Sequence, residues 1–148
     1  MTRWRGASVT FCAVGLAISG YLSIVHGASG QVPLLCSTSG LVDCEQVTTS
    51  AESFVGPLPV AYLGLVWFLV MLGLIAVAHP EPDTWSSTLR LAWAAIGTVF
   101  VIYLMYAELF LIGAICLWCT AIHVVVIALL LLEVGTFGGS REEITTAR

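Results

Sequence analysis

The chain has 148 residues, of which 59% are hydrophobic and only 9% are charged. A soluble domain carries roughly a quarter charged residues, so this composition indicates an integral membrane protein embedded in the lipid bilayer. The formal net charge of −4 offers no basic surface for nucleic acid. Membrane spans use most of the length, so we expect a single transmembrane domain over residues 1–148.

Four apolar segments are each long enough to cross a bilayer as a helix, which takes about 20 residues. They cover residues 9–26, 58–78, 89–112 and 115–133. These runs are too long for the strands of an outer-membrane barrel, which alternate over about ten residues. The expected fold class is therefore all-α, a bundle of four transmembrane helices. Arg3 and Arg5 before the first run also suit a signal peptide, although a signal core is usually about 7–15 residues.

The basic residues predict the orientation of this bundle. With four spans, the N-terminus, the loop 79–88 and the C-terminus share one side, and all the basic residues fall on it: Arg3, Arg5, Arg90, Arg141 and Arg148. The positive-inside rule makes that side cytoplasmic. We therefore expect a multi-pass protein of the cell (cytoplasmic or inner) membrane with both termini cytoplasmic. Residues 27–57 then form an extracytoplasmic loop.

This outer loop carries two cysteines. Cys36 and Cys44 lie eight positions apart around a turn at Gly40, and the segment from Cys44 to Ser50 suits a short helix with Val47 directed inward. The sequence Gly-Pro-Leu-Pro at residues 56–59 is expected to start the second span, because Pro is tolerated in a first helical turn. For this pair alone, a structural disulfide and a redox-active pair remain equally open.

A second cysteine pair, Cys116-Leu-Trp-Cys119, opens the fourth span. Spaced i and i+3, these two side chains are expected on one face of the first turns, where the helix N-terminus favours a thiolate. Four cysteines also make a complete zinc site, but a mobile loop carrying Cys36 argues against a closed one, so no metal is expected. Cys12 in the first span is expected to be a buried apolar residue.

Two pairs near one membrane face predict a series of thiol–disulfide exchanges, in which a thiolate attacks a disulfide sulfur at each step. The loop pair would meet a soluble protein. Cys44, nearer the membrane end of its loop, is the natural partner of Cys116. Cys119, one turn deeper, would then face the terminal electron acceptor. A lipid-soluble carrier of two electrons at that depth is most simply a quinone.

These residues and their order resemble the bacterial branch of the vitamin K epoxide reductase (VKOR) family, a group of thiol–quinone oxidoreductases that act like DsbB. The resemblance covers nearly the whole chain. It rests on Cys-x7-Cys from Cys36, Cys-x-x-Val-x-x-Ser from Cys44 to Ser50, Gly-Pro-Leu-Pro at 56–59, Cys-Leu-Trp-Cys at 116–119, and Ser19-Gly-Tyr-Leu in the first span.

The resemblance implies a four-helix bundle around a quinone, with a short loop helix over the pocket and electron flow from the loop pair to the helix pair. Cys36 would exchange with a secreted thioredoxin-fold protein of the DsbA type. Cys44 would relay to Cys116, Cys119 would face the quinone, and Ser50 would place a hydroxyl near its ring. The net reaction would oxidise the partner, reduce a quinone such as menaquinone or ubiquinone, and support disulfide bond formation.

Two departures limit what carries over. The vertebrate enzymes use an Asn to hydrogen-bond the quinone or epoxide, and this chain contains no Asn. They also carry a Tyr four residues after the second Cys of the pair, where this chain has His123. Vitamin K epoxide reduction and the vertebrate inhibitor response are therefore not expected to follow from the resemblance. Some bacterial members are fused to a thioredoxin-like domain; here the partner is expected to be a separate protein.

Two ionisable residues lie within spans. His123, at i+4 from Cys119, is about 5.4 Å deeper on the same helix face and is expected to line the quinone pocket, unless a backbone carbonyl satisfies it. Glu108 comes to a similar height as Cys119 and is a candidate for proton transfer. The resemblance gives no support for that role, and the alternative is a structural Glu that bonds a neighbouring helix or reaches toward the surface.

Other functions remain open at this stage. A DsbB-type oxidase has the same net reaction, but its Cys-x-x-Cys pair comes in the first outer loop, the reverse of the order here. The chain could also reduce a quinone or vitamin K epoxide with a different thiol donor. From another class, a small transporter or structural membrane subunit would use these cysteines only as stabilising disulfides.

Overall fold

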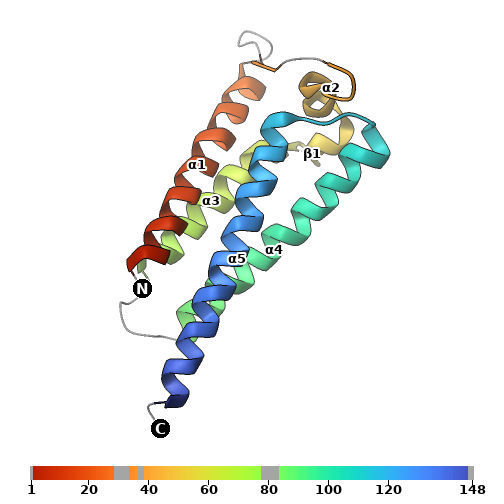
Figure 1. The fold of residues 1–148 in the computed structure, drawn as a ribbon. Helices are drawn as coiled ribbons and strands as arrows, with labels where there is room; N and C mark the ends of the chain where they lie inside the picture. Colours follow the sequence, from red (N-terminus) through yellow and green to blue (C-terminus); the bar gives the residue numbers. More distant parts are fainter. Residues whose placement is uncertain (1, 29–33, 37–38, 78–83, 147–148) are drawn as a thin grey trace.

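A computed structural model describes residues 2–28, 34–36, 39–77 and 84–146, with side chains for residues 4–28, 34–36, 39–77 and 85–138. It contains four long helices that form a bundle (Figure 1). The helices are α1 (Thr2–Gly27), α3 (Val60–Val77), α4 (Thr84–Tyr106) and α5 (Leu117–Thr146). The expected all-α fold is thus confirmed. The side chains of Arg3, Arg141 and Arg148, which were predicted to be cytoplasmic, lie outside the described set. Residues 79–83 of the predicted cytoplasmic loop also lie outside it.

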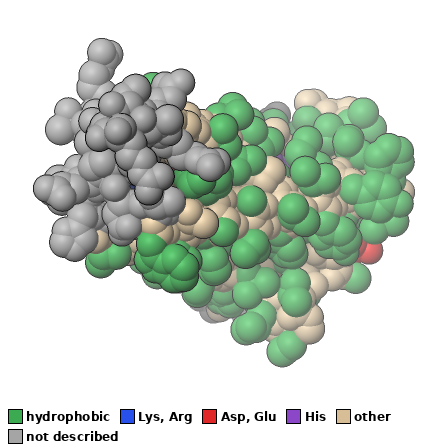
Figure 2. Space-filling model, turned by 90° about the horizontal axis from the view of Figure 1, so that it is seen from below, with side chains coloured by type: hydrophobic (Ala, Val, Ile, Leu, Met, Phe, Trp, Pro, Cys, Tyr) green, Lys and Arg blue, Asp and Glu red, His purple; other side chains and the backbone are tan. Residues whose placement is uncertain are grey.

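Each long helix is apolar enough to cross a membrane. The candidate spans are Trp4–Gly27, Val60–Val77, Trp85–Ile112 and Leu117–Gly138. Large hydrophobic side chains remain exposed along them, and hydrophobic side chains dominate the visible described face in Figure 2. An outer surface of this kind is stable when lipid, and not water, surrounds it.

The helix boundaries differ from the predicted spans at several points. Residues 84–88, expected in a loop, form the first turns of α4, where the Ser86 hydroxyl accepts a hydrogen bond from Arg90 Nη1 at 3.0 Å. A hydropathy pattern misses such turns because their residues are polar, although these residues form hydrogen bonds with one another within the helix. Likewise α1 starts at Thr2 and α5 continues to Thr146, beyond the apolar runs.

The expectation that Gly-Pro-Leu-Pro starts the second span is wrong. Strand β1 (Phe54–Val55) pairs antiparallel with β2 (Leu58–Pro59), and α3 begins only at Val60. Gly56 closes this hairpin with φ 63°, a left-handed conformation that favours glycine. A second correction concerns Ile115, predicted to begin the fourth span, which instead pairs with Val42 before α5 starts at Leu117.

Small residues let the helices approach closely. α1 packs against α3 and α5, and α4 packs against α5. Gly15 of α1 lies against the ring of Phe68, and Gly97 of α4 lies against the indole of Trp67, so that a Cβ atom at either glycine would clash. Close packing of an aromatic ring against a glycine supplies van der Waals contact of the kind that holds helices together in lipid. Cys12 is buried in the same core, as predicted.

The two ends of the bundle differ in character. The short helix α2 (Cys44–Thr49), the one-turn helix η1 (Ala51–Ser53), the hairpin and residues 113–116 gather at one end, which we call the loop end (Figure 1). At the opposite end, where α1 begins, Glu133 is only 2% exposed. Its carboxylate accepts hydrogen bonds from Arg90 Nε at 2.9 Å and Ser8 Oγ at 3.3 Å, which joins α5 to α4 and α1.

Breaking this ion pair from one side leaves a buried charge without its partner. We expect Glu133→Ala to lower the free energy of unfolding by about 3–5 kcal/mol. The double variant Arg90→Met with Glu133→Leu, which removes both charges, should recover most of that loss. Thermal and denaturant unfolding in detergent micelles measures both. A Glu133→Ala protein as stable as the wild type would contradict a stabilising role for the pair.

Candidate functional site

The loop cysteines form a disulfide at the start of α2. Cys36 and Cys44 are joined, and Cys44 is fully buried while Cys36 is partly exposed. Asp43 caps α2, since its Oδ1 accepts the backbone N–H of Gln46 at 2.9 Å. The predicted short loop helix is therefore confirmed, and Val47 is buried on its inner side as expected. A soluble partner can therefore reach the sulfur of Cys36, whereas the sulfur of Cys44 is enclosed by the protein.

A short backbone pairing joins this loop to the segment just before α5. The Asp43 N–H donates to the Ile115 carbonyl at 3.1 Å, and the Ile115 N–H donates to the Leu41 carbonyl at 2.8 Å. Gln46 Nε2 adds a contact to the Ile112 carbonyl at 3.3 Å. Because Cys44 follows Asp43 and Cys116 follows Ile115, the pairing sets the two cysteines side by side.

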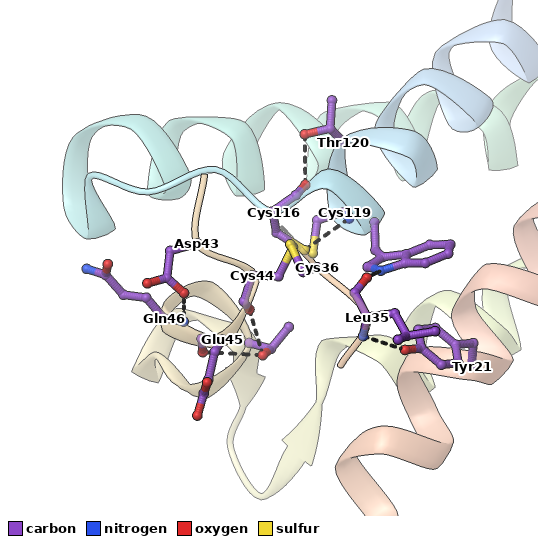
Figure 3. Close-up of a disulfide and its surroundings, with 12 residues drawn as sticks. Tyr21, Leu35, Cys36, Asp43, Cys44, Glu45, Gln46, Cys116, Cys119 and Thr120 are labelled. Atoms are coloured by element: carbon purple, nitrogen blue, oxygen red, sulfur yellow. Dashed lines mark hydrogen bonds between the residues drawn. A yellow bond between two sulfur atoms is a disulfide. The ribbon is translucent and has the colours of Figure 1, made fainter. Parts of the chain in front are cut away.

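Tyr21 and Trp118 secure the other end of the loop, beside Cys36. The Leu35 carbonyl accepts the indole Nε1–H of Trp118 at 2.8 Å, and the Leu35 N–H donates to the Tyr21 hydroxyl at 2.9 Å (Figure 3). The two rings also contact one another, with centroids 5.0 Å apart. Sequence reasoning did not assign these roles, although both residues lie within quoted motifs. The available signal was that Tyr21 and Trp118 each carry a polar group on an aromatic ring and stand near the predicted positions of the cysteines.

Cys116 is the N-cap residue of α5 and does not lie within its first turn, contrary to the expectation from spacing. Its carbonyl accepts the Thr120 N–H at 2.8 Å, and its Sγ accepts the Cys119 N–H at 3.3 Å. A side-chain hydrogen bond from the Cys119 thiol lowers the pKa of Cys116 below its usual value, despite burial and the nearby Glu108. The helix N-terminus favours the same thiolate.

The four sulfur atoms lie close together. Cys44 and Cys116 are fully buried in one small cluster with Val47 and Ala114, and Cys36 and Cys119 pack against it. Figure 3 shows the disulfide and the two helix thiols gathered between the loop and the start of α5. Cys116 and Cys119 are free thiols. With Cys36 and Cys44 joined, these four residues do not offer the four thiolates of a structural zinc site.

A cavity of about 310 Å³ extends from this cluster into the bundle. Its volume lies at the lower end of the range for small-molecule pockets, about 300–1,000 Å³. Its walls come from α1, α3, α4 and α5, with α2 and η1 at the loop end, and most of the lining is apolar. Ser50, Glu108, Cys119 and His123, which the sequence singled out separately, all line it.

Each of these polar residues has a distinct setting. His123 is buried in the cavity wall, and Ser50 Oγ donates to the Val47 carbonyl at 2.7 Å within its own helix end. Glu108 lies in η2 (Ala107–Ile112), a π-helical turn that replaces the α-helical end expected for the third span. The Glu108 carboxyl group lies beside the backbone N–H of Cys116. Such π-helical turns are frequent at functional sites.

Two further side chains line the cavity, and neither of them was assigned a role by the sequence analysis. His26, in the last turn of α1, contacts the Leu22 carbonyl through Nδ1 and the Thr48 carbonyl through Nε2, each at 3.0 Å, and so ties α1 to α2. Ser19 is fully buried, and within the described part of the chain its Oγ has no hydrogen-bond partner. An apolar cavity with a cysteine thiol and a hydroxyl that lacks an acceptor suits a flat apolar molecule with carbonyl oxygens, such as a quinone.

A model of the vitamin K epoxide reductase family matches residues 7–134. A search of curated proteins gives no match to the chain. The matched range holds both cysteine pairs, the short loop helix α2 and every residue described above at the cavity. Members of this family are oxidoreductases that use a quinone-type acceptor and a thiol partner. The chain therefore belongs to the vitamin K epoxide reductase family and is a membrane thiol oxidoreductase.

Proposed function

We propose that this protein passes electrons from a secreted thioredoxin-fold protein of the DsbA type through Cys36 and Cys44 to Cys116 and Cys119, and then to a membrane quinone. Its role would be to support disulfide bond formation. The observation that carries the proposal is the shared cluster of the two cysteine pairs, with Cys119 forming part of both the cluster and the cavity wall.

The charges of the bundle support an extracytoplasmic loop end. Arg90 lies near the opposite end, where α1 also carries Arg5, whereas Asp43, Glu45 and Glu52 lie at the loop end. Under the positive-inside rule this distribution directs the loop end outward, where conditions permit disulfides. Both termini would then be cytoplasmic, in a multi-pass protein of the cell membrane.

The first exchange takes place at the partly exposed sulfur. A thiolate of the partner attacks Sγ of Cys36, the Cys36–Cys44 bond breaks, and Cys44 leaves as a thiolate. The second thiol of the partner, after losing its proton, attacks the partner's own sulfur in the mixed disulfide and releases Cys36. The partner departs oxidised with its own disulfide, and the loop pair holds two electrons. Burial of Cys44 keeps soluble thiols away from it.

The second exchange transfers those electrons inward. When Cys116 and Cys119 are joined, the Cys44 thiolate attacks Sγ of Cys116 and releases Cys119. Cys36 then attacks Cys44, which restores the loop disulfide and releases Cys116 as a thiolate. The N-cap position, with the Cys119 N–H on its sulfur, stabilises that leaving thiolate. The product, a loop disulfide with two helix thiols, matches the redox state in the structure.

Residues of the cavity would hold the quinone at the last step. A bound quinone supplies an acceptor for two electrons and two protons and becomes a quinol. Cys119 presents its thiol to the cavity, His123 and Ser50 border the ring site, and the apolar wall excludes water. Glu108, beside the Cys116 N–H, is placed to take a proton from the helix pair and return it toward the cavity.

The direct test measures the redox state of a thioredoxin-fold partner in vesicles that contain this protein. We expect the partner to become oxidised only when the vesicles also contain menaquinone or ubiquinone, with quinol formed in a one-to-one ratio. Comparing the two quinones identifies the acceptor. The matched control is Cys36→Ala, which should stop oxidation of the partner. Equal partner oxidation in vesicles without quinone would refute the proposal.

The order of the relay is open to chemical trapping. In the Cys119→Ala protein, the Cys116 thiolate can attack Cys44 of the loop disulfide and release Cys36. No Cys119 thiol is then present to displace Cys44 from Cys116, so the Cys44–Cys116 bond should accumulate once the released Cys36 thiol is alkylated. Mass spectrometry of non-reduced peptides identifies it. Cys116→Ala is the matched control and should give no link between the loop and α5. If the Cys119→Ala protein contains only the Cys36–Cys44 bond under every redox condition, the relay order is wrong.

The role of Glu108 predicts a change in pH dependence. Glu108→Gln keeps the shape and the hydrogen-bonding capacity but cannot ionise. We expect a lower rate of quinone reduction and a lost or displaced inflection in the pH–rate profile, while the thermal unfolding temperature stays within a few degrees of the wild type. Stopped-flow measurement of quinol formation over a pH series provides the profile. An unaltered profile would leave Glu108 as a structural residue.

A further inference from the structure

Ser19 is unusual among the hydroxyl side chains of the bundle. It lies in α1, borders the cavity and is fully buried, yet within the described residues its Oγ makes no hydrogen bond. Four positions along the same helix, Ser23 Oγ donates to the Ser19 carbonyl at 2.7 Å. Thr98 of α4 makes the same kind of bond, to the Ala94 carbonyl at 2.9 Å. Ser19 is the exception to this local pattern.

A buried hydroxyl without a partner lowers stability, by about 1–3 kcal/mol in protein mutational data. The local environment does not force this cost, because a helical serine can ordinarily bond the carbonyl four residues before it. Residues that reduce stability in this way are retained where they serve a function. The space beside Ser19 is also kept open: the facing residue on α3 is Gly64, at which a Cβ atom would lie 3.1 Å from Ser19 Oγ.

The chemistry of the cavity restricts what this hydroxyl can bind. The lining is mostly apolar, and the hydroxyl of Ser50 already donates its proton to the Val47 carbonyl. The chain also lacks the Asn that would offer amide donors. A ligand for Ser19 therefore needs a polar atom that pairs with the hydroxyl, such as an acceptor for its proton, while remaining apolar elsewhere. A quinone carbonyl oxygen meets both conditions, and a hydrogen bond to it strengthens as electrons reach the ring and negative charge grows on the oxygen.

We propose that the Ser19 hydroxyl donates a hydrogen bond to a carbonyl oxygen of the quinone and so orients the ring in the cavity. This inference rests on the proposed function, in which the cavity receives the quinone. Ser19 acts from the α1 wall of the cavity, whereas Cys119 and His123 belong to the α5 wall. It is thus a binding residue separate from the cysteine relay, and its loss should leave the exchanges between the two pairs intact.

The test compares Ser19→Ala with Ser23→Ala, the same substitution one turn away, where the hydroxyl already has a partner and is not part of the cavity wall. Menadione and ubiquinone-1 serve as probes. Without quinone, Ser19→Ala should unfold at the same or a higher temperature than the wild type, because it removes an unsatisfied group. The dissociation constant of the quinone should be roughly two- to twelve-fold larger for Ser19→Ala than for the wild type. This change corresponds to the loss of about one hydrogen bond.

Infrared spectroscopy of carbon-13 carbonyl-labelled quinone adds a readout that does not depend on activity. The wild type and Ser23→Ala should show a carbonyl band shifted to lower frequency by hydrogen bonding, and Ser19→Ala should lose that component. Cys36–Cys44 reduction by the partner should be unchanged in both variants.

Each contrary result has a separate meaning. If the wild type shows no quinone-dependent stabilisation and no bound carbonyl band, the proposed function and this inference both fail. If the wild type binds quinone but Ser19→Ala has the same affinity and the same carbonyl band, the inference alone is overturned. A Ser19→Ala protein that is less stable without quinone, or an equal loss of affinity in Ser23→Ala, would also overturn it, because the hydroxyl would then have a structural role.

Discussion

The site depends on one short backbone pairing between the cysteine loop and the segment that precedes α5. Two hydrogen bonds, from Asp43 to Ile115 and from Ile115 to Leu41, connect segments about 70 positions apart in the chain. Thiol–disulfide exchange needs the attacking sulfur close to and in line with the sulfur it attacks, so a loop that moved freely would rarely react. The pairing sets Cys44 beside Cys116 and makes relay between the pairs geometrically possible.

The two helix cysteines differ in their local electrostatic environment. Cys116, outside the first helical turn, receives the Cys119 N–H on its sulfur, and this together with the helix N-terminus stabilises its thiolate. Cys119 lies within the helix and lines the apolar cavity. One sulfur thus lies in the cluster with the loop cysteines, and the other lines the cavity in which the proposed acceptor would bind. In the proposed relay, the two positions of this Cys-x-x-Cys pair would separate exchange with the loop from transfer to the acceptor over a single turn.

The cavity likewise combines a mostly apolar wall with a few polar groups. Its walls are apolar, which suits a ligand that arrives from the bilayer, and its few polar groups lie at separate places on α1, α4, α5 and the loop. His26 ties α1 to the loop helix, so the cover of the cavity and its wall are connected. At the far end, Arg90 and Glu133 join α4 to α5. Contacts at both ends thus connect the helices that surround the cavity.

Sequence patterns alone predicted the membrane class, the four helices, the two cysteine pairs and the family, because the length of an apolar run and the spacing of cysteines are local properties. Counting residues along the helices placed Glu108 and Cys119 at similar heights and His123 about one turn deeper. Only the tertiary structure decided that Cys116 is an N-cap, that Glu108 lies in a π-helical turn, and that Ser19 has no partner. These features depend on hydrogen bonds and packing between segments distant in the chain, and hydropathy and spacing carry no record of which distant atoms meet.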